Sequence, residues 1–274
     1  MASGVSAFPR RIDFSAPPIN EVVLGVQSDT LGMTVPFLGL FWAEVRHDYP
    51  RMEVHPPLEP VIERFGDRPE TVAPMGLGFR LLEKPETPRC WFLDQPGNRL
   101  IQVQQDRLVH NWRQVKDDDP YPRYKSVRAT FEREYQRLSA FIARERIGEM
   151  IPQQCEATYI NHIAATSFDT VFTALTPPRG FLPSPEQGAF NLTYRIPGEK
   201  GGPIGRLHVT MQPARRRRDD AALLVLNLTA RGVPDGEGLE GTLEFFDRAH
   251  EFIVQGFCDL TTPEMHKEWG RQNG

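Results

Sequence analysis

The sequence has few cysteines and no long apolar run, and both features restrict the class of protein to which it can belong. Cys90, Cys155 and Cys258 are far apart, so their spacing supports neither a paired disulfide framework nor a CxxC metal site. No stretch approaches the roughly 18 consecutive apolar residues of a membrane span, and the first residues lack the apolar core of a signal peptide. We therefore expect a cytoplasmic protein that does not associate with membranes.

An excess of basic charge is also missing. The 274 residues include 32 Lys and Arg against 36 Asp and Glu, a formal net charge of -4 at pH 7. A general polyanion binder is usually basic over a whole face, so that class is excluded. A local basic patch remains in four consecutive arginines, Arg215, Arg216, Arg217 and Arg218. They can meet nucleic-acid phosphates, but two aspartates follow directly, and a solvated hairpin loop is the other interpretation.

Motifs of catalysis and of metal or phosphate binding are absent as well. The seven histidines form no HxH or HExxH grouping, and no GxSxG element marks a hydrolase nucleophile. The glycines between residues 198 and 205 are not followed by the Gly-Lys-Ser or Gly-Lys-Thr of a phosphate-binding loop. We therefore expect no metal site, no cofactor and no catalytic residue, and favour a protein that is not an enzyme.

The chain is long enough for two coupled halves, residues 1–150 and 151–274. In the first half, apolar content and turn-forming residues predict a strand, a short buried helix, a helix or edge segment, and three further strands, at residues 19–27, 35–45, 58–65, 78–83, 89–94 and 99–112. An amphipathic helix over residues 124–146 should follow. Its apolar positions lie on one helical face: Val127, Phe131, Tyr135, Leu138 and Ile142.

The second half repeats this order of elements. Strands are predicted at residues 157–165, 190–196, 206–213 and 222–231, followed by a helix over 239–260. The repeated order suggests an internal duplication, although residue identity is slight and amphipathic patterning alone also explains it. We predict an α+β fold of two similar halves, each an antiparallel sheet covered by a long C-terminal amphipathic helix, with one joint core.

The strand predicted at residues 99–112 has an unusually polar face. Gln102, Gln104, Asp106 and His110 share one parity of that strand. Such a face can bind a base, a peptide backbone or a sugar through paired donors and acceptors. It also fits the solvated side of a sheet, or a buried ladder between the halves.

Aromatic and arginine side chains gather just after that strand. The candidate ligand or partner-binding residues there are Asn111, Trp112, Arg113, Tyr121, Arg123 and Tyr124. The aromatic rings can stack on a planar ligand, and Arg113 and Arg123 can bind a carboxylate or a phosphate through paired hydrogen bonds. The alternative is structural: Trp112 anchors the strand to the helix, and the acids at residues 117–119 shape the entry to that helix.

Several of these segments resemble a known family. They are PPINEVV at residues 17–23, LIQVQ at 100–104 with Asp106-Arg107 and Asn111-Trp112-Arg113, YPRY at 121–124 with Phe131, and Tyr159-Ile160-Asn161. The chain resembles a family of sporadically distributed, uncharacterised prokaryotic proteins of about this length. The resemblance implies no activity or cofactor. A patchy distribution implies genes that move horizontally, often beside defence or toxin and antitoxin systems.

Three hypotheses from different classes follow. The first is an interaction protein whose sheet face or helix seam engages a protein partner or a second copy of itself. The second is a nucleic-acid or nucleotide-binding protein that uses Trp112, Arg113, Arg123 and residues 215–218. The third is an enzyme whose site is assembled between the halves from Asp106, His110 and His162.

Overall fold

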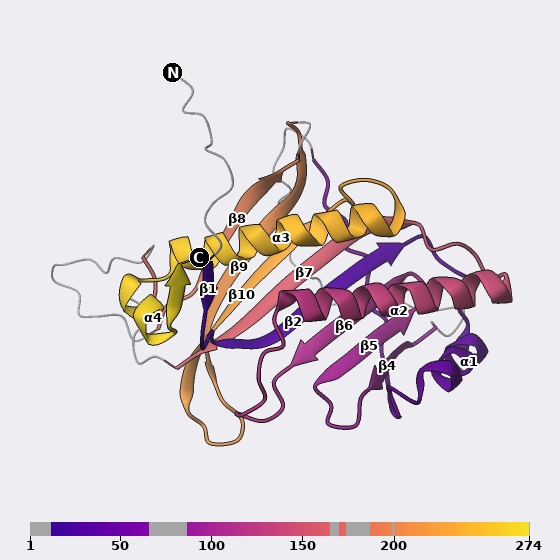
Figure 1. Ribbon diagram of the computed structural model, residues 1–274, viewed down its shortest axis with the longest axis horizontal. Coiled ribbons are helices and arrows are strands. Elements are labelled where there is room, and N and C mark those ends of the chain that lie inside the picture. The colour runs from indigo at the N-terminus through magenta and orange to yellow at the C-terminus, as the bar shows by residue number, and fades with distance from the viewer. Residues whose placement is uncertain (1–11, 66–86, 165–169, 174–186, 199–200, 274) are drawn as a thin grey trace.

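The computed structural model describes residues 12–65, 87–164, 170–173, 187–198 and 201–273 (Figure 1). Helices and strands follow along these residues in the order β1 (Ile12–Phe14), β2 (Ile19–Ser28), α1 (Val35–Val45), β3 (Arg51–His55), β4 (Arg89–Leu93), β5 (Arg99–Gln104), β6 (Arg107–Arg113), α2 (Tyr124–Glu145), β7 (Pro152–Ile163), β8 (Phe190–Pro197), β9 (Pro203–Arg215), β10 (Ala222–Gly232), α3 (Gly238–Leu260), α4 (Pro263–Glu268) and β11 (Arg271–Asn273). The strand predicted at 78–83 lies outside the described residues.

The fold is α+β and is built on one large antiparallel sheet. In the described residues nine strands pair in the order β3-β4-β5-β6-β2-β7-β10-β9-β8, and β1 pairs separately with β11. The strands predicted for the two halves thus form a single sheet instead of two. The join is the antiparallel pair of β2 with β7, which gives hydrogen-bond partners to two strand edges that separate sheets would leave open.

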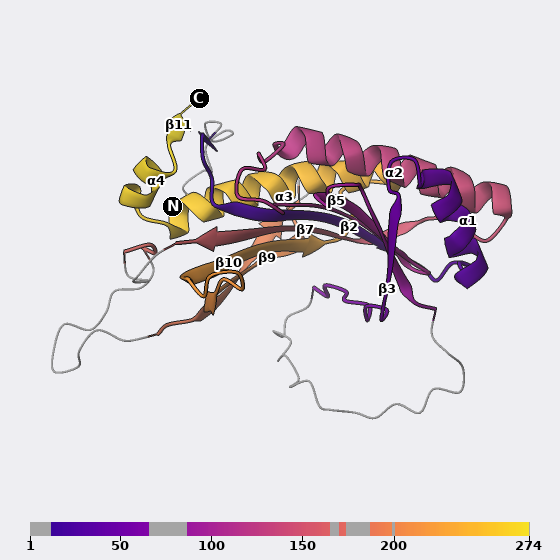
Figure 2. The same ribbon diagram turned by 90° about the horizontal axis from the view of Figure 1, so that it is seen from below.

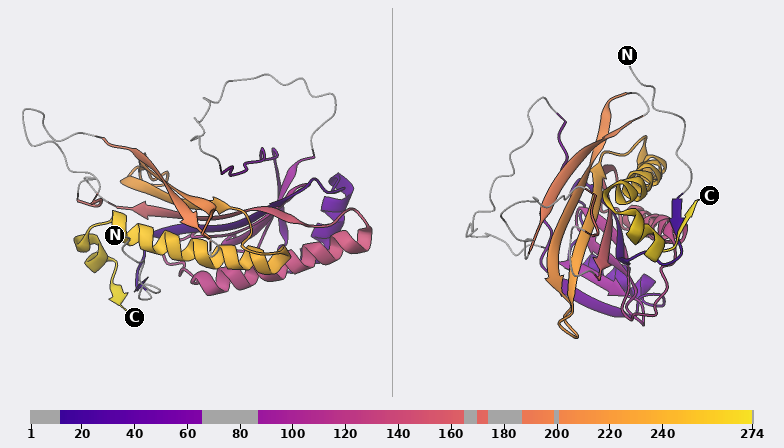
Figure 3. Two further views of the ribbon diagram at one scale, coloured as in Figure 1. Left: turned by 90° about the horizontal axis from the view of Figure 1, so that it is seen from above. Right: turned by 90° about the vertical axis from the view of Figure 1, so that its left-hand side faces the viewer.

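Both long helices lie on the same side of this sheet (Figures 1 and 3). Helix α2 packs on β6 and β2, helix α3 packs on β7, β10 and β9, and the two helices contact each other. The apolar positions predicted for residues 124–146 are all buried in α2, which confirms that helical face. The opposite side of the sheet, which we call the open face, carries no α-helix among the described residues (Figure 2).

The prediction of one strand over residues 99–112 is wrong. The chain turns at Gln105 and Asp106 and forms a hairpin in which Gln104 pairs with Arg107. The turn lacks the glycine and proline that usually mark a hairpin, so the sequence pattern did not reveal it. It inverts the expected parity: His110 lies on the helix side of the sheet, and Asn111 joins Gln102 on the open face.

A pair of glycines lets α3 approach the sheet closely. Gly205 in β9 and Gly232 in β10 are directly opposed, and the ring of Phe245 in α3 lies against both. A Cβ added at Gly232 would lie 2.1 Å from the carbonyl oxygen of Ile204 and 2.7 Å from Phe245. Both of these neighbours are held in place, one by the sheet backbone and one by complete burial.

We therefore expect Gly232→Ala to lower the free energy of unfolding by about 3 kcal/mol, because the added methyl group overpacks the sheet under α3. Urea denaturation followed by circular dichroism measures this. Gly39→Ala in the exposed part of α1, where an added Cβ meets nothing within 4 Å, is the matched control and should leave stability unchanged or raise it by up to about 1 kcal/mol. Equal effects of the two substitutions would contradict the packing described.

Candidate functional site

Polar side chains form a row across the open face at one end of the strands. Antiparallel pairing places Gln104 beside Arg107, Arg107 beside Gln27, and Gln27 beside Gln154. Paired residues in adjacent strands point to the same side of a sheet. The row therefore runs from β5 through β6 and β2 to β7, at right angles to the strands.

This row holds a segment of the chain that we call the strap, residues 57–65. The strap was predicted as a short helix or an edge segment, but it is irregular and crosses the open face (Figure 2). Its backbone N–H groups donate to glutamine side-chain oxygens. Leu58 donates to Gln104 Oε1 at 2.9 Å, and Glu63 donates to Gln154 Oε1 at 2.7 Å. Val61 donates to Gln27 Oε1 at 3.3 Å.

The strap's carbonyl groups are bound in the same way. Gln104 Nε2 donates to the oxygen of Leu58 at 3.0 Å, and Arg107 donates to the oxygen of Glu59 at 3.1 Å. Arg206 donates to the oxygen of Arg64 at 2.8 Å. The sheet thus binds a segment of polypeptide through side chains that recognise its backbone N–H and carbonyl groups, without strand pairing.

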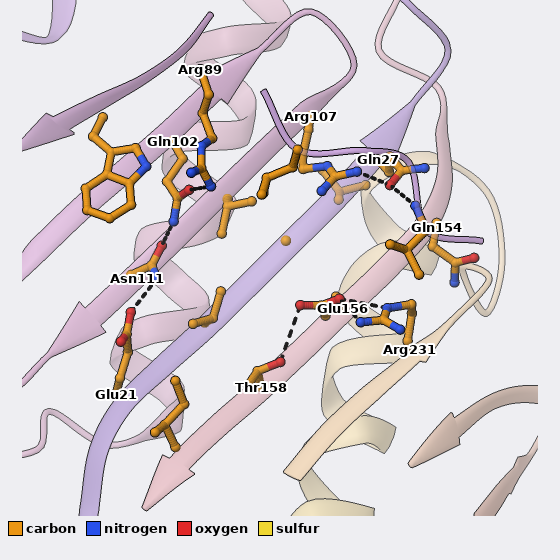
Figure 4. A pocket seen from close by; sticks show the side chains of 18 residues that line it. Glu21, Gln27, Arg89, Gln102, Arg107, Asn111, Gln154, Glu156, Thr158 and Arg231 are labelled. Atoms are coloured by element: carbon orange, nitrogen blue, oxygen red, sulfur yellow. Dashed lines mark hydrogen bonds and ion pairs between the residues drawn. The ribbon is translucent and has the colours of Figure 1, made fainter. Parts of the chain in front are cut away.

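A cavity of about 350 Å³ opens on the open face beside the strap (Figure 4). Two residues along the strands from the row of Gln27, Gly25 in β2 is paired with Val109 in β6 on one side and with Glu156 in β7 on the other. Because Gly25 has no side chain, it leaves a depression in the open face at that point. Leu58 and Val61 of the strap border the cavity.

One wall of the cavity is a chain of polar side chains, visible in Figure 4. Arg89 donates to Gln102 at 2.8 Å, Gln102 donates to Asn111 at 2.9 Å, and Asn111 donates to Glu21 at 2.6 Å. Burial raises the pKa of Glu21, while the Asn111 hydrogen bond and the charge of Arg113 lower it by less. The chain therefore places a cation at one end and a half-buried acid at the other.

Arg231 lines the cavity, and the strap's carboxylate lies next to it, outside the cavity lining. Glu63 accepts from Arg206 and from His208, both at 2.5 Å, and Arg231 lies 3.6 Å away. Arg231 donates to Glu156 at 2.7 Å. Burial raises the pKa of Glu63, but the hydrogen bonds and charges of His208 and Arg206 outweigh that effect, so the pKa is lowered.

Donor groups outnumber acceptors around this cavity. Four buried nitrogens that line it have no hydrogen-bond partner among the described residues: Arg89 Nε, Trp91 Nε1, Arg107 Nε and Gln154 Nε2. Buried donors without acceptors are costly, and in native proteins they call for an explanation.

The structure divides the predicted binding residues between the two sides of the sheet. Gln102, Gln104 and Asn111 lie on the open face and are buried. Arg113 lies at the end of β6, where it donates to the oxygen of Gly97 at 2.9 Å. Trp112 is on the helix side, so the predicted group does not form one site.

The predicted aromatic residues meet on the helix side, beside a separate cavity of about 950 Å³. Tyr121 lies 5.3 Å from the ring of Trp112, and its hydroxyl is 3.3 Å from that of Tyr159. Tyr124 stacks on His250 at 4.0 Å. Arg123 immediately precedes α2 and pairs with Asp13 at 2.9 Å. These contacts fix α2 to α3 and to the N-terminal segment.

The arginine loop is largely neutralised by neighbouring acids. Arg215 lies 3.1 Å from Asp220 and Arg216 lies 2.9 Å from Asp219. Arg218 pairs with Asp117 at 2.5 Å. All four arginines, including Arg217, are exposed between β9 and β10. The loop is thus an exposed turn of the hairpin between β9 and β10.

The residues of the enzyme hypothesis are separated. His110 faces the helices and is 1% exposed, while His162 is on the open side of β7. Burial, together with the charges of Arg99 and Arg133, lowers the pKa of His110 to about 3. Asp106 accepts from Gln104 at 2.6 Å in the hairpin turn. The fold does not bring these three groups to one place.

Eight residues of the open face were not among the candidates predicted from the sequence. The overlooked residues are Glu21, Gln27, Arg89, Trp91, Arg107, Gln154, Glu156 and Arg231. Alternation of polar residues within β2 and β7 was visible, as in Gln154, Glu156 and Thr158. The register that aligns them across strands was not, because it depends on pairing between distant segments.

Comparison with known proteins adds no assignment, since neither the protein-family models nor the curated proteins match this chain. In the described residues, no three His, Cys, Asp or Glu side chains are grouped to hold a metal ion. None of the helices in that part of the chain combines the length and apolarity needed to cross a bilayer.

Glu21 provides a pH test of the polar wall. Its raised pKa means that its favourable contribution to stability is present below the ordinary value of 4.5 and is lost as pH rises through the folded-state pKa. Glu21→Gln keeps an acceptor for Asn111 without the charge. We expect its free energy of unfolding, relative to wild type, to increase between about pH 4 and about pH 7.

Denaturant titrations at a series of pH values measure this difference. Glu149→Gln, at an exposed position after α2, is the control and should show a flat difference over the same range. A flat difference for Glu21→Gln would show that the Glu21 carboxyl is not desolvated as described.

Proposed function

We propose that this protein is a non-enzymatic interaction protein whose open face binds an extended polypeptide segment of a partner. One observation carries the proposal: the sheet already binds such a segment, its own strap, through side-chain amides and guanidinium groups that pair with the backbone. Backbone recognition accommodates many sequences, because every residue other than proline offers the same donor and acceptor.

The chemistry beside the strap supports a polypeptide over a nucleic acid. Glu21 and Glu156 line the cavity together with its arginines. Carboxylates repel phosphates, whereas a peptide backbone offers carbonyl groups to the arginines and N–H groups to the acids. The acids paired with residues 215–218 also reduce the attraction of that loop for polyanions.

We further infer that the two halves arose by duplication, with one long helix covering each half of the sheet. The strand order supports this, since β6, β5 and β4 follow outward from β2 as β10, β9 and β8 follow from β7. Helix α2 contacts the first set and α3 contacts the second. On this view the open face is centred on the seam between the halves, and the strap of the first half crosses to the second.

We also propose that the chain belongs to the family it resembles. The segments behind that resemblance supply the open face: residues 17–23 contribute Glu21, and residues 100–113 contribute Gln102, Gln104, Arg107 and Asn111. A binding surface shared by the family would explain why those polar residues stand out.

The proposal is tested by selecting peptides from a displayed random library on the immobilised full-length protein. We expect enriched peptides that bind in solution, and at least about tenfold weaker binding to Arg107→Met, because that variant loses a charge-assisted hydrogen bond to a carbonyl. Fluorescence anisotropy measures the affinities. Arg217→Met, which removes an exposed arginine of the loop, is the matched control and should bind as wild type does.

Two results would contradict the proposal. One is a library that yields no binder, or only binders that are insensitive to Arg107→Met. The other is binding of single-stranded RNA or a nucleotide that Arg217→Met abolishes, which would move the function to residues 215–218. A dimer whose interface covers the open face would identify a second copy as the occupant.

A further inference from the structure

The strap is anchored most firmly at its acidic residue. The Glu63 side chain is 9% exposed, and two basic side chains from β9 bind its two oxygens separately: Arg206 holds Oε2, and His208 holds Oε1. Arg231 from β10 places a second guanidinium group 3.6 Å from Oε1. Because Glu156 already occupies the Nε and Nη2 groups of Arg231, the cluster has capacity for one further carboxylate.

The rest of the strap is held by backbone hydrogen bonds and by the packing of Phe65 against Arg206, with little burial of apolar side chains. Its apolar side chains Leu58, Val61 and Ile62 are 38%, 46% and 46% exposed. Little apolar surface is therefore buried when the strap docks, and its backbone hydrogen bonds replace bonds to water at a small net gain. A segment that depends on one carboxylate and a few backbone contacts can be exchanged for another segment of the same chemistry.

We infer that Arg206, His208 and Arg231 form a carboxylate subsite for an acidic side chain of the partner, and that Glu63 occupies it as a tethered competitor. This inference rests on the proposed function and gives the partner a chemical class: an acidic, extended polypeptide. Tethering gives the strap a high effective concentration, so the partner must compete for the cluster.

The geometry also sets the register of that partner. The residue that supplies the carboxylate donates its own N–H to Gln154, and the residue two positions earlier donates to Gln27. The residue five positions earlier both donates to and accepts from Gln104. A matching peptide is therefore extended, and has its acid near the C-terminal end of the contact.

A fluorescein-labelled peptide with the sequence of residues 57–65 tests the inference. We expect it to bind full-length Glu63→Ala at least about tenfold more tightly than wild type, since the variant's strap no longer fills the subsite. The same peptide with glutamine at the position of Glu63 should lose that advantage. Glu264→Ala, at an exposed position in α4, is the control and should bind as wild type does.

A second variant protects the test against a folding defect. Arg206→Met in the Glu63→Ala background should abolish the gain, while thermal unfolding reports whether each variant remains folded. Equal binding of the peptide to wild type and to Glu63→Ala would contradict the inference that Glu63 acts as a competitor. It would not contradict the proposal that the open face binds peptides. Binding to neither protein, together with a library that yields no binder, would overturn the proposed function as well.

Discussion

The antiparallel pairing of β2 with β7 is the constraint on which the rest of the structure depends. It joins the strands of both halves into one sheet and sets Gln27 opposite Gln154 and Gly25 opposite Glu156. A shift of one residue would turn these polar side chains toward the buried helices. The same pairing thus aligns the row that holds the strap and lowers the floor of the cavity beside it.

Local pattern was sufficient to predict much of the fold. The apolar period of residues 124–146 placed the buried face of α2 correctly, and alternation with turn residues located most strands. The hairpin at Gln105 and Asp106 was missed because it carries no glycine or proline. As a result His110 was assigned to the polar face, although its side chain lies on the helix side of the sheet.

The site was harder to predict than the fold, because it depends on contacts between distant segments. Gln102 and Gln104 were identified from one strand, but their partners were not. Asn111, the partner of Gln102, was placed on the opposite face, and Leu58, the partner of Gln104, was placed in a helix or an edge segment. Nothing local indicates that residues 57–65 cross the sheet. The aromatic group at Trp112 and Tyr121 was conspicuous in the sequence, and it fixes α2 to its neighbours.

A sheet face with unpaired donors and half-buried acids is costly to maintain, which is expected of a surface preorganised for a ligand. The most direct test of this account is an NMR measurement of hydrogen exchange at the strap amides of Leu58 and Glu63. We predict slow exchange in the free protein, where both amides are hydrogen-bonded, and faster exchange when an unlabelled peptide of residues 57–65 displaces the strap. Fast exchange of both amides in the free protein, or an exchange rate that saturating peptide does not change, would contradict this account.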